Sequence, residues 1–121
     1  AATGQSVRTK AKIDPLLDSR FLQRWGEMYA GKYELTHPLV SPLYANAEGL
    51  PPLLIQVGTE EVILDDSTRF AEMAKKAGVK VDLEVWEGMF HVWQFAWRII
   101  PEANRAIKKI AKFIQKNADS L

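Results

Sequence analysis

The segment LLIQVGTEE, residues 53–61, decides the fold class of this chain. Its first five residues are almost wholly apolar and a glycine follows them, a pattern typical of a short strand buried on both faces of a parallel sheet. An amphipathic helix is predicted to open at Asp65 or Asp66, which are interpreted as capping residues, and to end at Gly78. The next stretch, VKVDLEVWEG at 79–88, alternates apolar and polar residues, which predicts a half-exposed strand near a sheet edge.

Two further helices are expected on either side of this strand–helix–strand unit. One follows Asp18 or Ser19 and stops at Gly31, and the other starts at Pro101. Each carries an apolar stripe at helical spacing: Phe21, Leu22, Trp25, Met28 and Tyr29 in the first, and Ala103, Ala106, Ile107, Ile110, Phe113 and Ile114 in the second. Two strands cannot build a sheet that buries both faces, so the pattern indicates a piece of an α/β fold without its other strands.

The domain organisation predicted from these elements is one part of a single domain covering residues 1–121. Residues 1–13 are polar and aperiodic, as in a loop entered in the middle of a fold. Residues 14–50 comprise a helix and a long proline-rich connection, and residues 51–121 form the strand–helix–strand–helix unit.

The composition excludes several function classes. The chain has no cysteine, which excludes disulfides, zinc–thiolate sites and a cysteine nucleophile. The net charge of +1 does not favour nucleic-acid binding, and the lysines near the C-terminus have the spacing of a solvated helix face. The first ten residues lack the apolar stretch of a signal peptide, and no apolar run reaches the roughly 18 residues of a membrane span, so we expect a cytoplasmic protein.

An acid and a histidine follow the two predicted strands. In open α/β sheets the working residues lie beyond the carboxyl ends of the strands, where this chain has Glu60, Glu61 and His91. A carboxylate can fix the tautomer of a histidine, and histidine can move a proton near neutral pH. The residues alone leave open that His91 is only packed in a turn beside tryptophans. His37 has no such acid, and neither histidine has a second ligand at metal-binding spacing.

Several motifs together carry a family resemblance across residues 14–116. They are Ser-Pro-Leu at 41–43, Pro-Pro-Leu-Leu-Ile at 51–55, Val-Gly-x-x-acid-x-x-x-Asp-Asp at 57–66, Ala-Gly-Val at 77–79 and Gly-Met-x-His-Val-Trp at 88–93. With them the chain resembles the C-terminal part of the hormone-sensitive-lipase-like esterases, bacterial family IV of the α/β-hydrolase fold. The resemblance implies an α/β fold class, with the last two strands of a mostly parallel sheet plus flanking helices and with the N-terminal part absent.

The resemblance also implies a triad of serine, acid and histidine in that chain order, with His91 as base and Glu61 as acid. Many relatives have aspartate at the acid position. Of the neighbouring acids, Glu60 is expected to point elsewhere, and Asp65 and Asp66 are better explained as helix caps than as the triad acid. Val62 and Val92, beside the two catalytic positions, are either lining residues of a substrate pocket or ordinary core valines. The chemistry of such a triad needs no cofactor and no metal.

The chain departs from the family by lacking the nucleophile. None of its serines lies in a Gly-x-Ser-x-Gly motif, and the His-Gly-Gly-Gly oxyanion motif is absent. We therefore expect a serine carboxylesterase in which this chain supplies acid and base, with an acyl ester as substrate and the missing N-terminal half as partner. The 121 residues alone are expected to be inactive. A homodimer through the last strand is also implied by the resemblance.

The alternative function is non-enzymatic. A short, catalytically inactive α/β module could act by pairing an exposed strand edge with another protein. Residues 79–88 permit this interpretation because their alternating pattern places them near a sheet edge.

Overall fold

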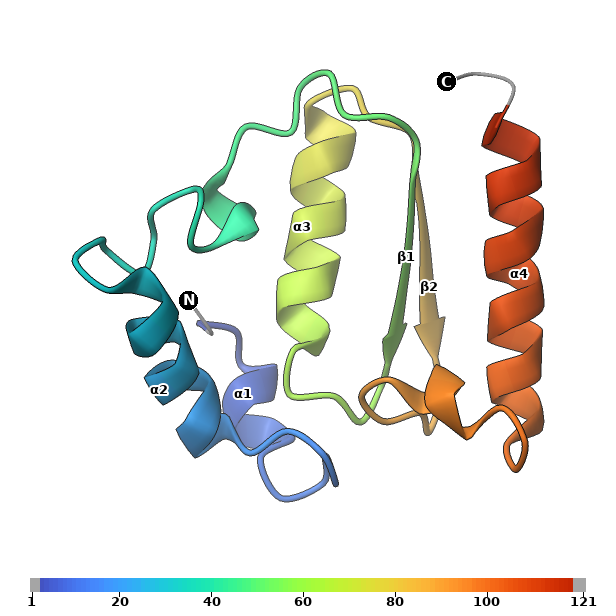
Figure 1. Ribbon diagram of the computed structural model, residues 1–121, viewed down its shortest axis with the longest axis horizontal. Coiled ribbons are helices and arrows are strands. Elements are labelled where there is room, and N and C mark those ends of the chain that lie inside the picture. Colours follow the sequence, from blue (N-terminus) through green and yellow to red (C-terminus); the bar gives the residue numbers. More distant parts are fainter. Residues whose placement is uncertain (1–2, 119–121) are drawn as a thin grey trace.

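The structure is a computed structural model that describes residues 3–118. A two-stranded sheet separates two long helices, with α3 on one face and α4 on the other (Figure 1). In chain order the elements are α1 (Ser6–Thr9), α2 (Ser19–Ala30), the 3₁₀ helix η1 (Pro42–Tyr44), β1 (Leu53–Gly58), α3 (Leu64–Lys76), β2 (Val81–Trp86), the 3₁₀ helix η2 (Trp93–Ala96) and α4 (Pro101–Ala118).

The two strands pair in parallel, as the strand–helix–strand pattern predicts. Leu53 lies opposite Val81 at the start of the ladder, and Gly58 lies opposite Trp86 at its end. Because both strands finish at the same level, the loops that follow them leave the sheet side by side at one edge of the molecule (Figure 1).

Each face of the sheet has its own small hydrophobic core. Under α3, alanines of the helix meet valines at the start of β2; the buried members are Ala47, Ala71, Ala74, Val79 and Val81. Under α4, Trp93 is buried against Ala103 and Ala106, with Trp86 and Phe90 packed around it. Alanines on both helices let the helix backbones approach the sheet closely, so these two clusters fix the helices relative to the strand ends.

The helix ends show which local sequence signals correctly predict where a helix begins or ends. Asp18 accepts a hydrogen bond from the Arg20 N–H at 2.8 Å and so caps α2, and Gly31 ends this helix with a φ of 56°. For α3 only the prediction of the capping residues was wrong, because Asp65 and Asp66 lie inside the first turn and Ile63 precedes the helix without a side-chain cap. The N–H of Asp65 instead donates to the Ser6 hydroxyl, 59 positions away, which no local pattern reveals.

Burial is also less complete than the sequence predicts. Only Val57 and Gly58 of β1 are buried, and the apolar stripe of α2 is largely exposed. On α4 the two alanines are covered, whereas Ile107, Ile110 and Ile114 are exposed. A two-stranded sheet offers too little area to cover these surfaces.

The polar segment 1–13 contains one turn of helix, α1, where an irregular loop was expected. Among residues 3–118, no helix combines the length and the apolar character needed to cross a bilayer.

Candidate active site

The loops after β1 and β2 are hydrogen-bonded to each other. The Thr59 N–H donates to the Trp86 carbonyl at 2.9 Å, and the Glu60 N–H donates to the Met89 carbonyl at 3.1 Å. In the other direction the Gly88 N–H donates to the Thr59 hydroxyl at 2.8 Å. These three bonds fix the segment that carries Glu61 against the segment that carries His91.

Gly58 allows this close approach. A Cβ atom at position 58 would lie 2.0 Å from the Met89 carbonyl oxygen, far inside van der Waals contact. Any other residue would therefore push the two loops apart, which explains why glycine ends the strand.

Glu61 is buried and both of its carboxylate oxygens have partners. Oε1 accepts a hydrogen bond from the Gly58 N–H at 2.7 Å, and Oε2 lies 2.8 Å from the His91 Nδ1 atom. The first bond holds the carboxylate at the end of β1, so that the second oxygen faces the histidine. The sequence predicted that both residues lie at the same edge of the sheet, and in the structure they are in direct contact.

The contact with Glu61 sets the tautomer of His91. A carboxylate oxygen is a hydrogen-bond acceptor, so the imidazole proton is on Nδ1 and Nε2 is left as an acceptor. Among residues 3–118 no hydrogen-bond partner is found for Nε2. The His91 side chain is 27% exposed, against 4% for Glu61. The pair therefore presents an oriented imidazole with one free nitrogen, which is the arrangement of a general base.

Backbone strain follows the histidine directly. Val92 has a φ of 52°, in the left-handed region that β-branched residues rarely adopt. This residue turns the chain into η2, where the Phe95 N–H donates to the Val92 carbonyl at 3.0 Å. Strained residues of this kind concentrate at functional sites, and each costs about 1–3 kcal/mol.

The other predicted residues lie away from the acid–histidine pair or are buried beside it. Glu60 points toward Lys10, with Oε2 3.6 Å from Nζ, as expected for the acid outside the pair. Val62 is wholly buried, which favours a core position, whereas Val92 is partly exposed. His37 accepts a hydrogen bond from the Leu39 N–H through Nδ1 at 3.2 Å, within its own loop.

Within residues 3–118 no group of three or more histidine, aspartate or glutamate side chains is arranged to hold a metal ion.

Two buried polar residues near the N-terminus, Ser6 and Asp14, could not be found from the sequence, although both contact the loop that carries Glu61. Their only local signal is that they are small polar residues, Ser6 within the segment expected to be irregular and Asp14 just after it.

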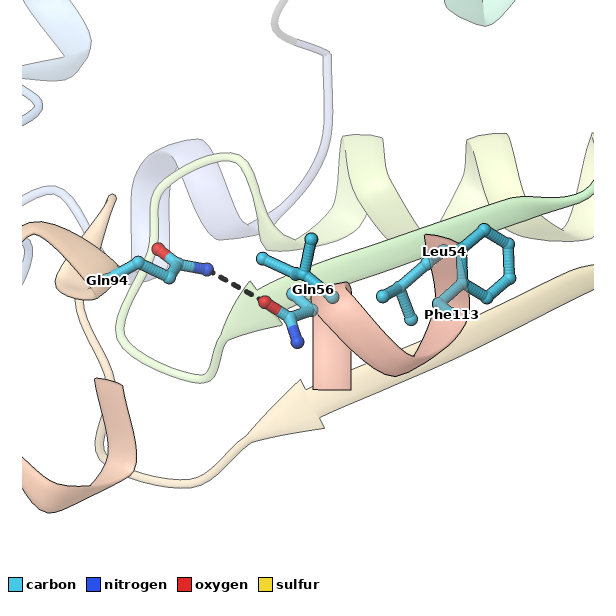
Figure 2. A pocket seen from close by; sticks show the side chains of 5 residues that line it. Leu54, Gln56, Gln94 and Phe113 are labelled. Carbon is cyan, nitrogen blue, oxygen red and sulfur yellow. Dashed lines mark hydrogen bonds between the residues drawn. The ribbon is translucent and has the colours of Figure 1, made fainter. Parts of the chain in front are cut away.

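A separate pocket lies between β1 and α4. It is lined by Leu54, Gln56, Gln94, Ile110 and Phe113. Figure 2 shows Gln94 pointing toward Gln56, whose Oε1 atom accepts a hydrogen bond from Gln94 at 3.1 Å. Gln56 also donates to the carbonyl of Ala106 and so connects the strand to α4. Neither Glu61 nor His91 lines this pocket, so it is distinct from the acid–histidine pair.

Comparison with known proteins places this chain in a family. Residues 1–95 match the family described as alpha/beta hydrolase fold. An acetyl-hydrolase of Streptomyces hygroscopicus is 43% identical over 115 residues, which are 95% of this chain and 38% of that protein.

Solved structures give the same result. An esterase from the bacterial hormone-sensitive lipase family superposes with a TM-score of 0.91 at 46% identity, over 95% of this chain and 39% of that one. The esterase EstE5, in a crystal soaked with p-nitrophenyl butyrate, superposes with a TM-score of 0.89 at 39% identity, over 95% of this chain and 38% of that one. The chain thus spans about two fifths of the length of the relatives it matches. It belongs to the alpha/beta hydrolase fold family and corresponds to the C-terminal portion of members of the hormone-sensitive lipase family.

Proposed function

We propose that this chain supplies the acid and the base of a Ser–Glu–His triad in a carboxylic-ester hydrolase. Glu61 is the acid, His91 is the base, and the serine comes from a part of the enzyme outside these 121 residues. The observation that carries the proposal is the 2.8 Å contact between Glu61 Oε2 and His91 Nδ1, which leaves Nε2 free. The esterases among the relatives support the class of reaction.

The proposed reaction has two halves. The serine Oγ attacks the ester carbonyl while His91 Nε2 takes the hydroxyl proton, and the carbonyl electrons form an oxyanion. The C–O bond to the alcohol then breaks, and His91 returns the proton to the departing alkoxide. Water attacks the acyl-enzyme in the same way, with His91 again accepting and returning the proton. Glu61 holds the ring and stabilises the imidazolium that forms in each half.

The proposed substrate is a short- or medium-chain acyl ester. Support comes from the relatives, of which one carries the name acetyl-hydrolase and another was soaked with p-nitrophenyl butyrate. The proposed partners are the remaining part of the hydrolase fold and, in a homodimer, a second copy paired along β2. Within residues 3–118, β2 pairs only with β1, along one edge, which leaves its other edge for such a contact.

The test is steady-state hydrolysis of p-nitrophenyl butyrate by the protein as its natural gene produces it. We expect His91→Ala to lower kcat by about 10⁶-fold. Glu61→Gln is expected to lower kcat by about 10⁴-fold, because an amide in place of the carboxylate no longer keeps the proton of His91 on Nδ1. His37→Ala and Glu60→Gln are the matched controls, since each changes the same residue type outside the pair, and both are expected to keep kcat within about twofold.

Retention of hydrolysis in His91→Ala would contradict the proposal. The denatured mass of the natural protein gives a second, independent check. A mass matching 121 residues would leave no room for the serine in the same chain, and the interaction-module alternative would then replace the enzyme.

A further inference from the structure

Two buried polar side chains of the N-terminal segment contact the loop that carries Glu61, and the proposed mechanism gives them no role. Ser6 is 3% exposed and Asp14 is 9% exposed. They come from α1 and from the turn that follows it, which lie beside the lower end of α3 (Figure 1). Buried polar groups are retained where they make specific hydrogen bonds, so their partners indicate what they do.

Asp14 holds the backbone N–H of the residue after the acid. Its Oδ2 atom accepts from the Val62 N–H at 3.1 Å, while Oδ1 accepts from the N–H groups of Leu16 and Leu17 at 3.0 and 3.1 Å. One carboxylate thus joins a local turn to the loop after β1, 48 positions away.

Ser6 holds the carbonyl of the same residue. Its hydroxyl donates to the Val62 carbonyl at 2.8 Å and accepts from the Asp65 N–H at 3.1 Å. The Ser6 N–H in turn donates to Asp65 Oδ2 at 2.9 Å. Both backbone groups of Val62 are therefore held by side chains of the N-terminal segment, and Val62 is wholly buried, so water cannot replace either partner.

The position of these bonds matters because Val62 directly follows Glu61. The Val62 N–H belongs to the peptide plane that follows Glu61, and the Glu61 N–H, which donates to the Gly58 carbonyl at 3.3 Å, belongs to the plane that precedes it. These two planes set the direction in which the Glu61 side chain leaves the backbone, and the bond from Ser6 to the Val62 carbonyl fixes the plane that comes after them. The contact of Oε2 with His91 then needs little further ordering when the substrate binds.

We propose that Ser6 and Asp14 are positioning residues that hold Glu61 in the geometry in which it orients His91. This inference rests on the proposed function, because it assigns Ser6 and Asp14 a part in the same reaction. Neither residue touches the substrate, so their removal is expected to change kcat and to leave KM nearly unchanged.

The kinetic test uses Ser6→Ala and Asp14→Ala in the protein as its natural gene produces it, with p-nitrophenyl butyrate. We expect each variant to lower kcat by about 10- to 100-fold with KM within about twofold, as for residues that orient a functional group. Asp18→Ala is the matched control. Asp18 also accepts a backbone N–H through its carboxylate, but at the start of α2, so this variant is expected to keep kcat within about twofold.

A second variant covers the case in which Asp14→Ala fails to fold. Asp14→Asn keeps the shape of the side chain but can no longer accept hydrogen bonds at both oxygens. We expect it to fold and to show a smaller fall in kcat than Asp14→Ala. Thermal unfolding of every variant, followed by circular dichroism, establishes that the assays compare folded proteins.

A spectroscopic readout separates this inference from the proposed function. The proton on His91 Nδ1 is held by Glu61, so it should give a downfield proton resonance that is absent in His91→Ala. We expect Asp14→Asn and Ser6→Ala to shift or broaden this resonance, and Asp18→Ala to leave it unchanged.

Folded Ser6 and Asp14 variants with kcat within threefold of the parent and an unchanged resonance would overturn the inference, even if His91→Ala abolishes hydrolysis. If His91→Ala keeps full activity, the proposed function fails, and the resonance alone still decides whether Ser6 and Asp14 position Glu61.

Discussion

At the scale of the residue, the geometry of the Glu61–His91 pair depends on a glycine as much as on the two side chains themselves. Gly58 ends β1 because the Met89 carbonyl occupies the space that a Cβ atom would need. Its N–H also donates to Glu61 Oε1. Gly58 therefore allows the two loops to meet and at the same time binds the acid that reaches across to His91.

A substitution at this glycine tests the geometry without changing any titratable side chain. We expect Gly58→Ala to lower kcat for p-nitrophenyl butyrate by more than about 10-fold, because displacement of the loops by about 1 Å separates Glu61 from His91. It should also destabilise the protein by about 1–3 kcal/mol, measured by urea unfolding, since overpacking strains the backbone.

Gly26→Ala is the matched control for this prediction. Gly26 lies in the middle of α2, and an added Cβ would meet Leu35 Cδ2 at 3.6 Å, an ordinary contact. Alanine there is expected to stabilise the protein by about 0.5–1 kcal/mol and to leave kcat unchanged. Equal effects of the two substitutions on kcat would count against the geometric role of Gly58.

Sequence and structure agree to different degrees on the individual site residues. The positions of Glu61 and His91 after two neighbouring strands could be predicted, because strand patterns and the family motifs are local in the sequence. Ser6 and Asp14 could not be predicted. Their role depends on hydrogen bonds to Val62 across 56 and 48 positions, and no spacing rule connects such residues.

At the scale of the element, the α4 side of the sheet depends on one tryptophan. Trp93, the first residue of η2, is 1% exposed and packs against Ala103, Ala106 and Trp86. It lies two positions after His91, so the cluster that holds α4 against the sheet also supports the loop that carries His91.

Truncation of the Trp93 side chain should lower the free energy of unfolding strongly, and its indole Nε1 atom should contribute little to that free energy. We expect Trp93→Ala to lower the free energy of unfolding by about 3–5 kcal/mol, because a large cavity forms beneath α4. Trp93→Phe should cost no more than about 2 kcal/mol, since Trp93 Nε1 has no hydrogen-bond partner among residues 3–118. Chemical unfolding measures both values, and equal losses would show that the ring volume is not the main contribution.

Helix and strand positions were largely predictable because their signals are periodic. The cap at Asp18, the stop at Gly31 and the parallel pairing of β1 with β2 follow from the pattern. The capping of α3 does not follow from the pattern, because the Asp65 N–H donates to Ser6 of α1 and neither Asp65 nor Asp66 caps the helix. How deeply β1 and the apolar stripes of α2 and α4 are buried could not be predicted, because burial depends on neighbouring surfaces that residues 3–118 do not provide.

At the scale of the whole molecule, large apolar side chains remain exposed on several elements. Phe21, Trp25, Met28 and Tyr29 are exposed along α2, and Ile107, Ile110 and Ile114 along α4. The matched relatives are more than twice as long as this chain. Exposed apolar surface of this kind marks a place where another segment or protein packs.

Produced alone, the 121 residues should be inactive and should expose apolar surface. We expect no hydrolysis of p-nitrophenyl butyrate above the uncatalysed rate, because no serine lies in a nucleophile motif, and strong fluorescence with the dye ANS, which binds exposed apolar surface. Hydrolysis that disappears in His91→Ala would show instead that a nucleophile lies within these residues.

The contacts of Ser6 with Val62 and Asp65 also have a consequence for the order of folding. The pairing of β1 with β2 closes a loop of 28 residues, and the contact of His91 with Glu61 spans 30. The contacts of Ser6 span 56 and 59 positions, so their closure carries a larger entropic cost and is expected to come later. We therefore expect Glu61 and His91 to meet before the N-terminal segment docks, and the hydrogen bonds of the loop after β1 to be completed only by that docking.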